Sequence, residues 1–246
     1  MSEIVDTASA KEFMQEVLGK VSADELITIA DSLQLKSQVF QTLLQPEGIQ
    51  SLTEKEALKL LRLVFSTRRS AKQFLEAQPL EIFKNWVSEL LYGEDELERR
   101  FQTFCDHLEP SAIRYPNDLA GELLHFTFPD KYWLWCRWMW DPKTKTGSLP
   151  LVVTESFDLH APTVGESYLK IGKAVAFVHH TGEAAGFQNI SRSLFGTNVF
   201  LCSVYVIYIY TVLRMRMTQE FNKVIPELAE FTRRLLGVLR TEELKL

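Results

Sequence analysis

Apolar residues recur at helical spacing along most of the chain, and polar signals mark where the repeats begin. Residues 22–25 (Ser-Ala-Asp-Glu) have the pattern of a capping box ahead of an apolar stripe, and residues 53–56 (Thr-Glu-Lys-Glu) repeat it. The spacing predicts consecutive amphipathic helices as far as Pro110, with no internal sequence repeat. The first half of the chain is therefore expected to be helical.

The most hydrophobic stretch lies near the C-terminus. Residues 199–213 contain no charged side chain, and no Gly or Pro interrupts the chain before Pro226. A single helix over 197–224 is predicted, apolar on all sides in its first half and therefore central to the core. Fifteen residues are fewer than the roughly 20 that a membrane span needs. The prediction is a buried helix and no transmembrane segment, with a short membrane insertion as the alternative.

Between these parts lies an unusual concentration of aromatic residues with one Arg among them. Four tryptophans fall within the eight residues 133–140. Aromatic density favours a strand, the segment 141–147 (Asp-Pro-Lys-Thr-Lys-Thr-Gly) is typical of a hairpin loop, and the β-branched run at 149–154 supplies a returning strand. A β-hairpin over about 132–154 is predicted. The alternative is a helix that begins after Pro129.

These elements predict a mainly α, multi-helix globular protein with one β-hairpin and a long buried helix. An N-terminal helical region, 1–109, is expected to pack against a C-terminal region, 110–246, and the two regions can also form one domain.

Composition narrows the class of protein. The 27 basic and 32 acidic residues give a net charge of −5, which disfavours a protein that mainly wraps nucleic acid. The N-terminus lacks the apolar segment of a signal peptide. Cys105, Cys136 and Cys202 are widely spaced in apolar surroundings, as buried thiols in a reducing compartment are. A cytoplasmic protein is predicted.

The aromatic stretch is the first candidate site. A cluster of large aromatic rings can form a core, an interface or the wall of a ligand site. The Arg within it gains cation–π attraction from the indoles, and its N–H groups can bind a carboxylate or a phosphate. Structurally, Arg137 would stack on core aromatics and pair with Asp130 or Asp141. Functionally, the stretch would bind a ligand or partner through Tyr132, Trp133, Trp135, Arg137, Trp138 and Trp140.

A metal site is the second candidate. Glu122 and His125 stand three residues apart on a predicted helix, as in di-metal bundle sites, although no second Glu-x-x-His occurs. A mononuclear site would combine His125, His160 and His179 with a carboxylate. A single hydrogen-bonded His near the core is the simpler interpretation of His125.

No phosphate-binding loop, dinucleotide fingerprint, nucleophile elbow or Cys-x-x-Cys is present. The main prediction is a cytoplasmic accessory, assembly or regulatory protein that binds a protein partner or a second copy of itself. The first alternative is an enzyme or small-ligand-binding protein, with or without a metal, whose pocket is lined by the tryptophans, histidines and tyrosines. The second is nucleic-acid binding through two basic pairs, Arg68-Arg69 and Arg99-Arg100, which are otherwise solvated helix faces.

Overall fold

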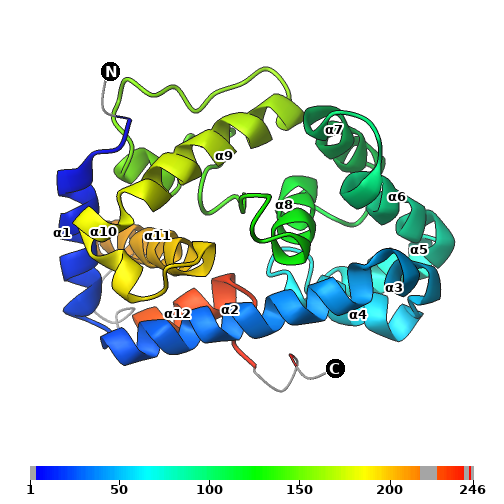
Figure 1. The fold of residues 1–246 in the computed structure, drawn as a ribbon, viewed down its shortest axis with the longest axis horizontal. Helices are drawn as coiled ribbons and strands as arrows, with labels where there is room; N and C mark the ends of the chain where they lie inside the picture. The colour runs from blue at the N-terminus through cyan, green and yellow to red at the C-terminus, as the bar shows by residue number, and fades with distance from the viewer. Residues whose placement is uncertain (1–3, 217–225, 241–243, 245–246) are drawn as a thin grey trace. The chain divides into compact units, whose positions relative to one another are not determined.

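The computed structural model describes residues 4–216, 226–240 and 244, and the described part is mainly helical, as predicted (Figure 1). Twelve α-helices and two short 3-10 helices are found within it, and none of its residues forms a strand. The α-helices are α1 (Thr7–Leu18), α2 (Ala23–Leu44), α3 (Pro46–Ser51), α4 (Glu54–Leu63), α5 (Ala71–Ala77), α6 (Leu80–Tyr92), α7 (Leu97–Leu108), α8 (Pro116–Thr127), α9 (Val164–His180), α10 (Gly182–Ala185), α11 (Leu194–Arg216) and α12 (Leu228–Leu235).

The chain folds into two compact units, each built from several segments. The first unit contains residues 1–33, 138–158 and 174–239, and the second contains residues 34–137, 159–173 and 240–246. The helices α2 and α9 each contribute residues to both units. The predicted boundary near residue 109 stays a prediction.

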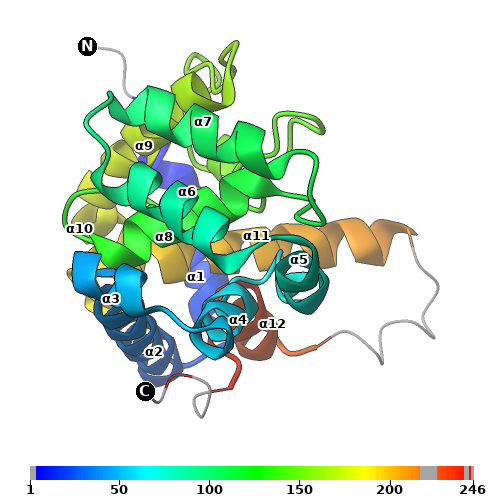
Figure 2. The same ribbon diagram turned by 90° about the vertical axis from the view of Figure 1, so that its right-hand side faces the viewer.

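The second unit is formed around the helices α6, α7 and α8, which pack against one another (Figure 2). The capping box at 53–56 is present: the Thr53 side chain accepts the Glu56 N–H at 3.3 Å, and the Glu56 carboxylate accepts the Thr53 N–H at 2.9 Å. It begins α4, whose C-terminal end lies inside the unit. The local sequence signal therefore sets the start of α4.

The predicted β-hairpin is wrong. Residues 132–136 have neither strand nor helix structure, and the return segment contains a 3-10 turn at Leu149–Leu151. The two sides of the loop still pair locally: Asp141 and Thr146 form an isolated antiparallel bridge, and the Ser148 and Leu149 N–H groups donate to the Trp138 and Met139 carbonyls at 3.0 Å. The physical reason is that the Tyr132 and Trp133 carbonyls accept hydrogen bonds from side chains, and a backbone group that is already satisfied gains nothing from pairing with a second strand.

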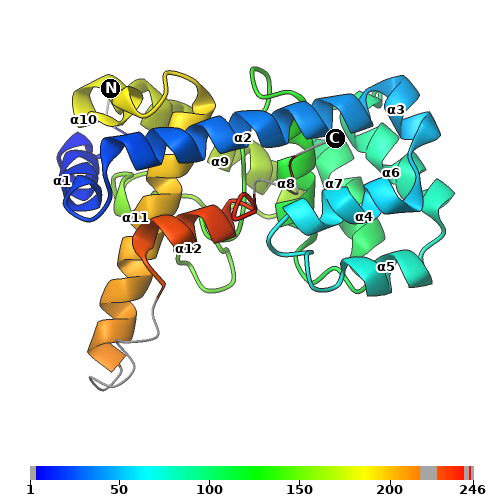
Figure 3. The same cartoon turned by 90° about the horizontal axis from the view of Figure 1, so that it is seen from below.

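The first unit is organised around α11, and α1, α10 and α12 pack against it or against each other (Figures 1 and 3). The first half of α11 is buried, with Val199, Phe200, Leu201 and Cys202 all fully covered. The predicted core helix is therefore confirmed for this half. The predicted continuation to residue 224 passes beyond residue 216 into a segment outside the described residues.

By length and composition, Leu194–Leu213 is apolar enough to cross a membrane, and 61% of the most apolar window is buried inside the structure. Such burial is typical of the core helix of a soluble protein. Beyond the core, the end of α11 extends past α12 (Figure 3), and Tyr208, Ile209, Val212 and Leu213 are partly exposed there.

Candidate functional site

The segment 132–136 runs beside α8 without regular secondary structure, and other parts of the second unit donate hydrogen bonds to it. The Tyr132 carbonyl accepts from His125 Nδ1 at 2.8 Å, so this imidazole carries its proton on Nδ1. The Trp133 carbonyl accepts the Tyr168 hydroxyl at 3.0 Å. A Cβ atom at Gly121 would lie 2.3 Å from the Trp135 carbonyl oxygen, so only glycine permits this approach to α8. Side chains and a glycine thus replace a partner strand.

Most of the aromatic residues singled out in the sequence are buried. Trp135 is 1% exposed and stacks on Phe101, with ring centroids 5.8 Å apart, and Phe101 stacks in turn on Tyr168 at 4.3 Å. Tyr132 is buried in the same unit, where its hydroxyl accepts from Arg100. These rings belong to the core of the second unit.

The remaining tryptophans of the stretch divide between the units. Trp138 and Trp140 belong to the first unit and are buried there. Trp133 belongs to the second unit and is partly exposed, with its ring 3.3 Å from the place where a Cβ atom of Gly172 would stand. Trp133 and Arg137 are therefore the partly exposed members of the six predicted binding residues.

Arg137 stacks on a ring that the sequence analysis did not single out. Its guanidinium carbon lies 3.5 Å from the centroid of the Tyr115 ring, and that of Arg114 lies 5.3 Å from the same centroid. Tyr115 and Arg137 are partly exposed, and Arg114 is exposed. We call these three residues, Arg114, Tyr115 and Arg137, the Tyr115 cluster.

A buried carboxylate fixes the backbone of this cluster. Asp118, in the first turn of α8, is 5% exposed and accepts the Arg137 backbone N–H at 2.7 Å. An acidic residue in the first helical turn also interacts favourably with the helix dipole. Asp118 thereby holds the chain at Arg137, so the side chain begins from a fixed position. The predicted pairing of Arg137 with Asp130 or Asp141 is replaced by the Tyr115 ring and this backbone contact.

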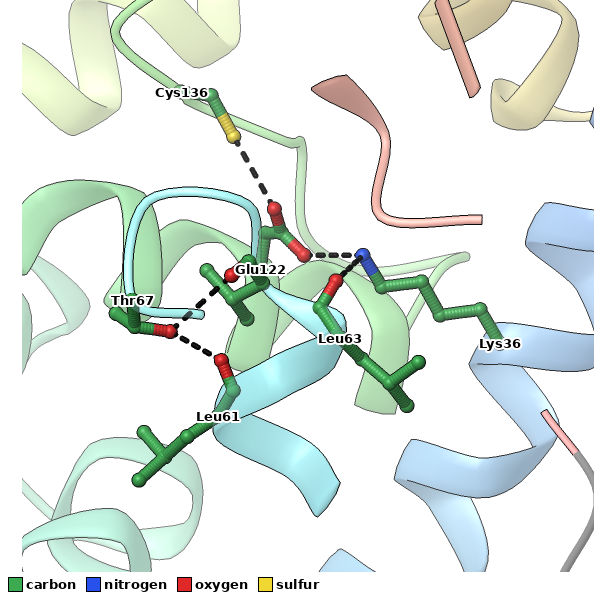
Figure 4. Close-up of polar contacts among 7 residues, drawn as sticks. Lys36, Leu61, Leu63, Thr67, Glu122 and Cys136 are labelled. Atoms are coloured by element: carbon green, nitrogen blue, oxygen red, sulfur yellow. Dashed lines mark hydrogen bonds and ion pairs between the residues drawn. The ribbon is translucent and has the colours of Figure 1, made fainter. Parts of the chain in front are cut away.

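The second unit also contains a buried ion pair between Lys36 of α2 and Glu122 of α8 (Figure 4). The Lys36 ammonium is fully buried, and the Glu122 side chain is 4% exposed. The Glu122 carboxylate also lies 3.8 Å from the Cys136 sulfur, which donates to it. A buried charge is stable only when it is paired and hydrogen-bonded. The other contacts of Lys36 therefore also determine how well its charge is stabilised.

Two further groups stabilise the ammonium. Lys36 donates to the Leu63 carbonyl at 2.9 Å, at the C-terminal end of α4, where the helix dipole is negative (Figure 4). Its nitrogen also lies 4.3 Å from the centroid of the Phe126 ring, a cation–π distance. The Thr67 hydroxyl donates to the Leu61 carbonyl at 2.5 Å and so satisfies a neighbouring helix-end acceptor. The pair therefore joins α2, α4 and α8.

Burial shifts the pKa values of Glu122 and His125, both on α8, in opposite directions. It raises the pKa of Glu122 to about 7, against the lowering effect of the Lys36 ammonium. It lowers the pKa of His125 to about 4, so this imidazole is neutral at pH 7. The neutral His125 donates a hydrogen bond to the backbone. This is the simpler interpretation given for it above, a single hydrogen-bonded histidine near the core.

The raised pKa of Glu122 predicts a pH-dependent stability. A glutamate carboxyl ordinarily has a pKa of 4.5, and the folded value for Glu122 is about 7, so between these values the folded state retains a proton that the unfolded state has released. Its contribution to stability is complete below about pH 4.5 and is lost as the pH rises through 7, by up to about 1.4 kcal/mol per pH unit. Urea unfolding of the wild type and of Glu122→Gln should show the difference in unfolding free energy falling over this window. A difference that grows with pH would show that Lys36 keeps Glu122 ionised.

The residues predicted as metal ligands occupy separate environments. Glu122 and His125 lie on α8 with the partners described above. His160 is exposed, and its carbonyl accepts from Lys170; His179 belongs to the first unit, where its Nδ1 lies 2.7 Å from the Thr197 hydroxyl. Among the described residues, no three His, Cys, Asp or Glu side chains gather closely enough to hold a metal ion.

One member of the basic pairs, Arg100, differs from the solvated face expected of it, whereas Arg69 and Arg99 are exposed. Arg100 is buried and donates to the Leu90 and Asp95 carbonyls, at the end of α6 and in the turn that follows it. Arg99 is exposed and lies 3.6 Å from Asp95. Arg100 thus satisfies backbone carbonyls inside the unit. The three cysteines are buried thiols, as expected.

Sequence reasoning missed Lys36, Tyr115 and Asp118. A signal for Lys36 existed: it occupies a core position of an apolar stripe on α2, together with Ile29, Leu33, Phe40 and Leu44, all of them fully buried. A lysine at such a position needs a buried acid, and Glu122 is the acid within the apolar face of α8. Tyr115 gave no comparable signal, because its ring meets Arg137 only through the folded chain.

Comparison of the chain with protein-family models, curated proteins and solved structures finds no match.

Proposed function

We propose that this chain is a cytoplasmic accessory or assembly protein that binds another protein through the Tyr115 cluster. One observation carries the proposal: the Arg137 guanidinium stacks 3.5 Å from the Tyr115 ring centroid at a partly exposed position. Within the described part of the chain, this guanidinium forms no ion pair or side-chain hydrogen bond. Its N–H groups are open to a partner.

The arrangement favours protein recognition for energetic reasons. Arg and Tyr are enriched among the residues that dominate protein interfaces. Stacking on Tyr115 and the Asp118 contact at the backbone both reduce the freedom of Arg137 before binding, so less entropy is lost when a partner docks. A stacked guanidinium retains its planar set of donors, which matches a carboxylate bidentately.

Charge defines the expected partner surface. Arg114 and Arg137 place two positive charges beside one aromatic ring, in a protein whose net charge is −5. A partner that presents an Asp or Glu next to an apolar or aromatic side chain fits both the donors and the ring. A second copy of this chain is one partner of this kind.

Affinity capture from extracts of the native cells tests the proposal. Arg137→Ala is expected to lower partner recovery at least tenfold, since truncation of a central interface residue costs about 2 kcal/mol or more. Arg137→Lys should also weaken recovery, because an ammonium keeps the charge but not the planar donors. Arg99→Ala is the matched control, an exposed Arg of the same unit outside the cluster, and should recover the partner normally.

Equal recovery by Arg137→Ala and wild type, with both folded, would contradict the proposal. Recovery that disappears after nuclease treatment would instead identify a nucleic acid as the partner, and strong salt dependence would accompany it.

A further inference from the structure

A cavity of about 390 Å³ lies between α3 and α6 in the second unit, apart from the Tyr115 cluster (the two helices are seen in Figure 1). This volume is within the range of about 300–1,000 Å³ that is typical of small-molecule sites. Its walls combine apolar and polar groups, contributed by Pro46, Ile49, Gln50, Glu81, Lys84, Asn85, Ser88 and Tyr92. The polar residues of α6 recur every three or four positions, so one face of that helix lines the cavity.

Lys84 is the central polar group of this cavity. Its side chain is 10% exposed, and its ammonium donates to the Gln50 carbonyl at 2.6 Å and to the Glu81 carboxylate at 2.8 Å. The Gln50 carbonyl is one of the last acceptors of α3, so this contact fixes the ammonium at the helix end. An ammonium has three N–H donors, and these contacts use two.

The Glu81 contact is replaceable. The Glu81 side chain is 76% exposed, and an exposed carboxylate contributes little to an ion pair. Beside Lys84, the Asn85 amide and the Ser88 hydroxyl have no hydrogen-bond partner within the described ranges of the chain. An incoming carboxylate would therefore find a fixed cation and two unused polar groups, at the position that Glu81 now occupies from the solvent side.

We propose that this cavity is a binding site for a small carboxylate that carries an apolar or aromatic body. The carboxylate takes the place of the Glu81 side chain at the Lys84 ammonium and accepts from Asn85 or Ser88. The apolar body packs on the Tyr92 ring, which is held in place by the bond from its hydroxyl to the Leu44 carbonyl at 2.7 Å. Pro46 and Ile49 supply the facing apolar wall.

The probe pair benzoate and benzamide tests the proposal, because the two differ in charge and little in shape. In ¹H–¹⁵N correlation spectra, benzoate is expected to shift the amide signals of residues 49–50 and 84–88, and benzamide to shift them far less. Lys84→Met should weaken benzoate binding at least tenfold, as expected for loss of a charge-assisted hydrogen bond. Lys84→Arg should retain binding, since it keeps the positive charge.

Glu81→Gln is expected to change the affinity for benzoate in the opposite direction. Removing the competing carboxylate is expected to tighten benzoate binding about two- to fivefold, in keeping with the small contribution of an exposed ion pair. Lys72→Met, at an exposed lysine of α5, is the matched control and should not change binding. Equal shifts with benzamide, unchanged affinity in folded Lys84→Met, or weaker binding in Glu81→Gln would each overturn the proposal.

Discussion

Lys36→Met and Glu122→Leu, each alone, are expected to destabilise the protein by about 3–5 kcal/mol, because each leaves an uncompensated buried charge or acid. The double variant is expected to recover most of this loss, since two apolar side chains of similar size remove both charges from the core. Urea unfolding of the four proteins measures the coupling. The Lys36 ammonium is fully buried, so water cannot replace the Glu122 carboxylate when that carboxylate is removed.

The exposed pair Lys72–Glu76 on α5 is the matched control for this cycle. Its nitrogen and oxygen lie 3.5 Å apart, yet the side chains are 75% and 64% exposed. Removing either residue should change the unfolding free energy by less than about 0.5 kcal/mol. Additive losses in the Lys36 and Glu122 cycle, with no recovery in the double variant, would show that the two side chains do not depend on each other.

Trp135→Ala is expected to cost about 3–5 kcal/mol of unfolding free energy, because a fully buried indole is lost from its stack on Phe101. Trp133→Ala should cost less than half as much, since Trp133 is partly exposed and loses fewer contacts. Thermal or urea unfolding of both variants provides the comparison. Equal losses, or a larger loss for Trp133→Ala, would contradict the assignment of Trp135 to the core.

Local signals in the sequence were enough for most of the helices. The Thr53–Glu56 capping box begins α4, and Thr163 accepts the Glu166 N–H at 3.1 Å at the start of α9. Both signals act within one turn, so they do not depend on the rest of the fold. The buried first half of α11 followed from its lack of charged residues.

The aromatic stretch shows where local reasoning fails. Strand propensity describes how well side chains fit a half-buried pleated surface, and here no second strand offers such a surface among the described residues. The backbone at Tyr132 and Trp133 accepts from His125 and Tyr168 instead, residues whose nearness is decided by helix packing. The clustering of tryptophans signalled a core more than a surface.

The candidate site depends even more on tertiary structure. The sequence singles out Arg137 as the one Arg of the aromatic stretch, but Tyr115 lies 22 positions earlier and Lys36 much earlier still. A charge in a helix stripe can be recognised as buried, whereas its partner on another helix is defined only by packing. The Tyr115 cluster thus emerges only in the folded second unit.

Site-specific photocrosslinking at Arg114 tests the protein-binding role of the Tyr115 cluster most directly. Arg114 is exposed beside the Tyr115 ring, so a benzoylphenylalanine there leaves Tyr115 and Arg137 in place. The proposal predicts a discrete protein adduct in native cells that disappears when Arg137→Ala is added, and no such adduct from the same group at exposed Lys11 of α1. An adduct that persists unchanged with Arg137→Ala, or the absence of any protein adduct at Arg114, would contradict it.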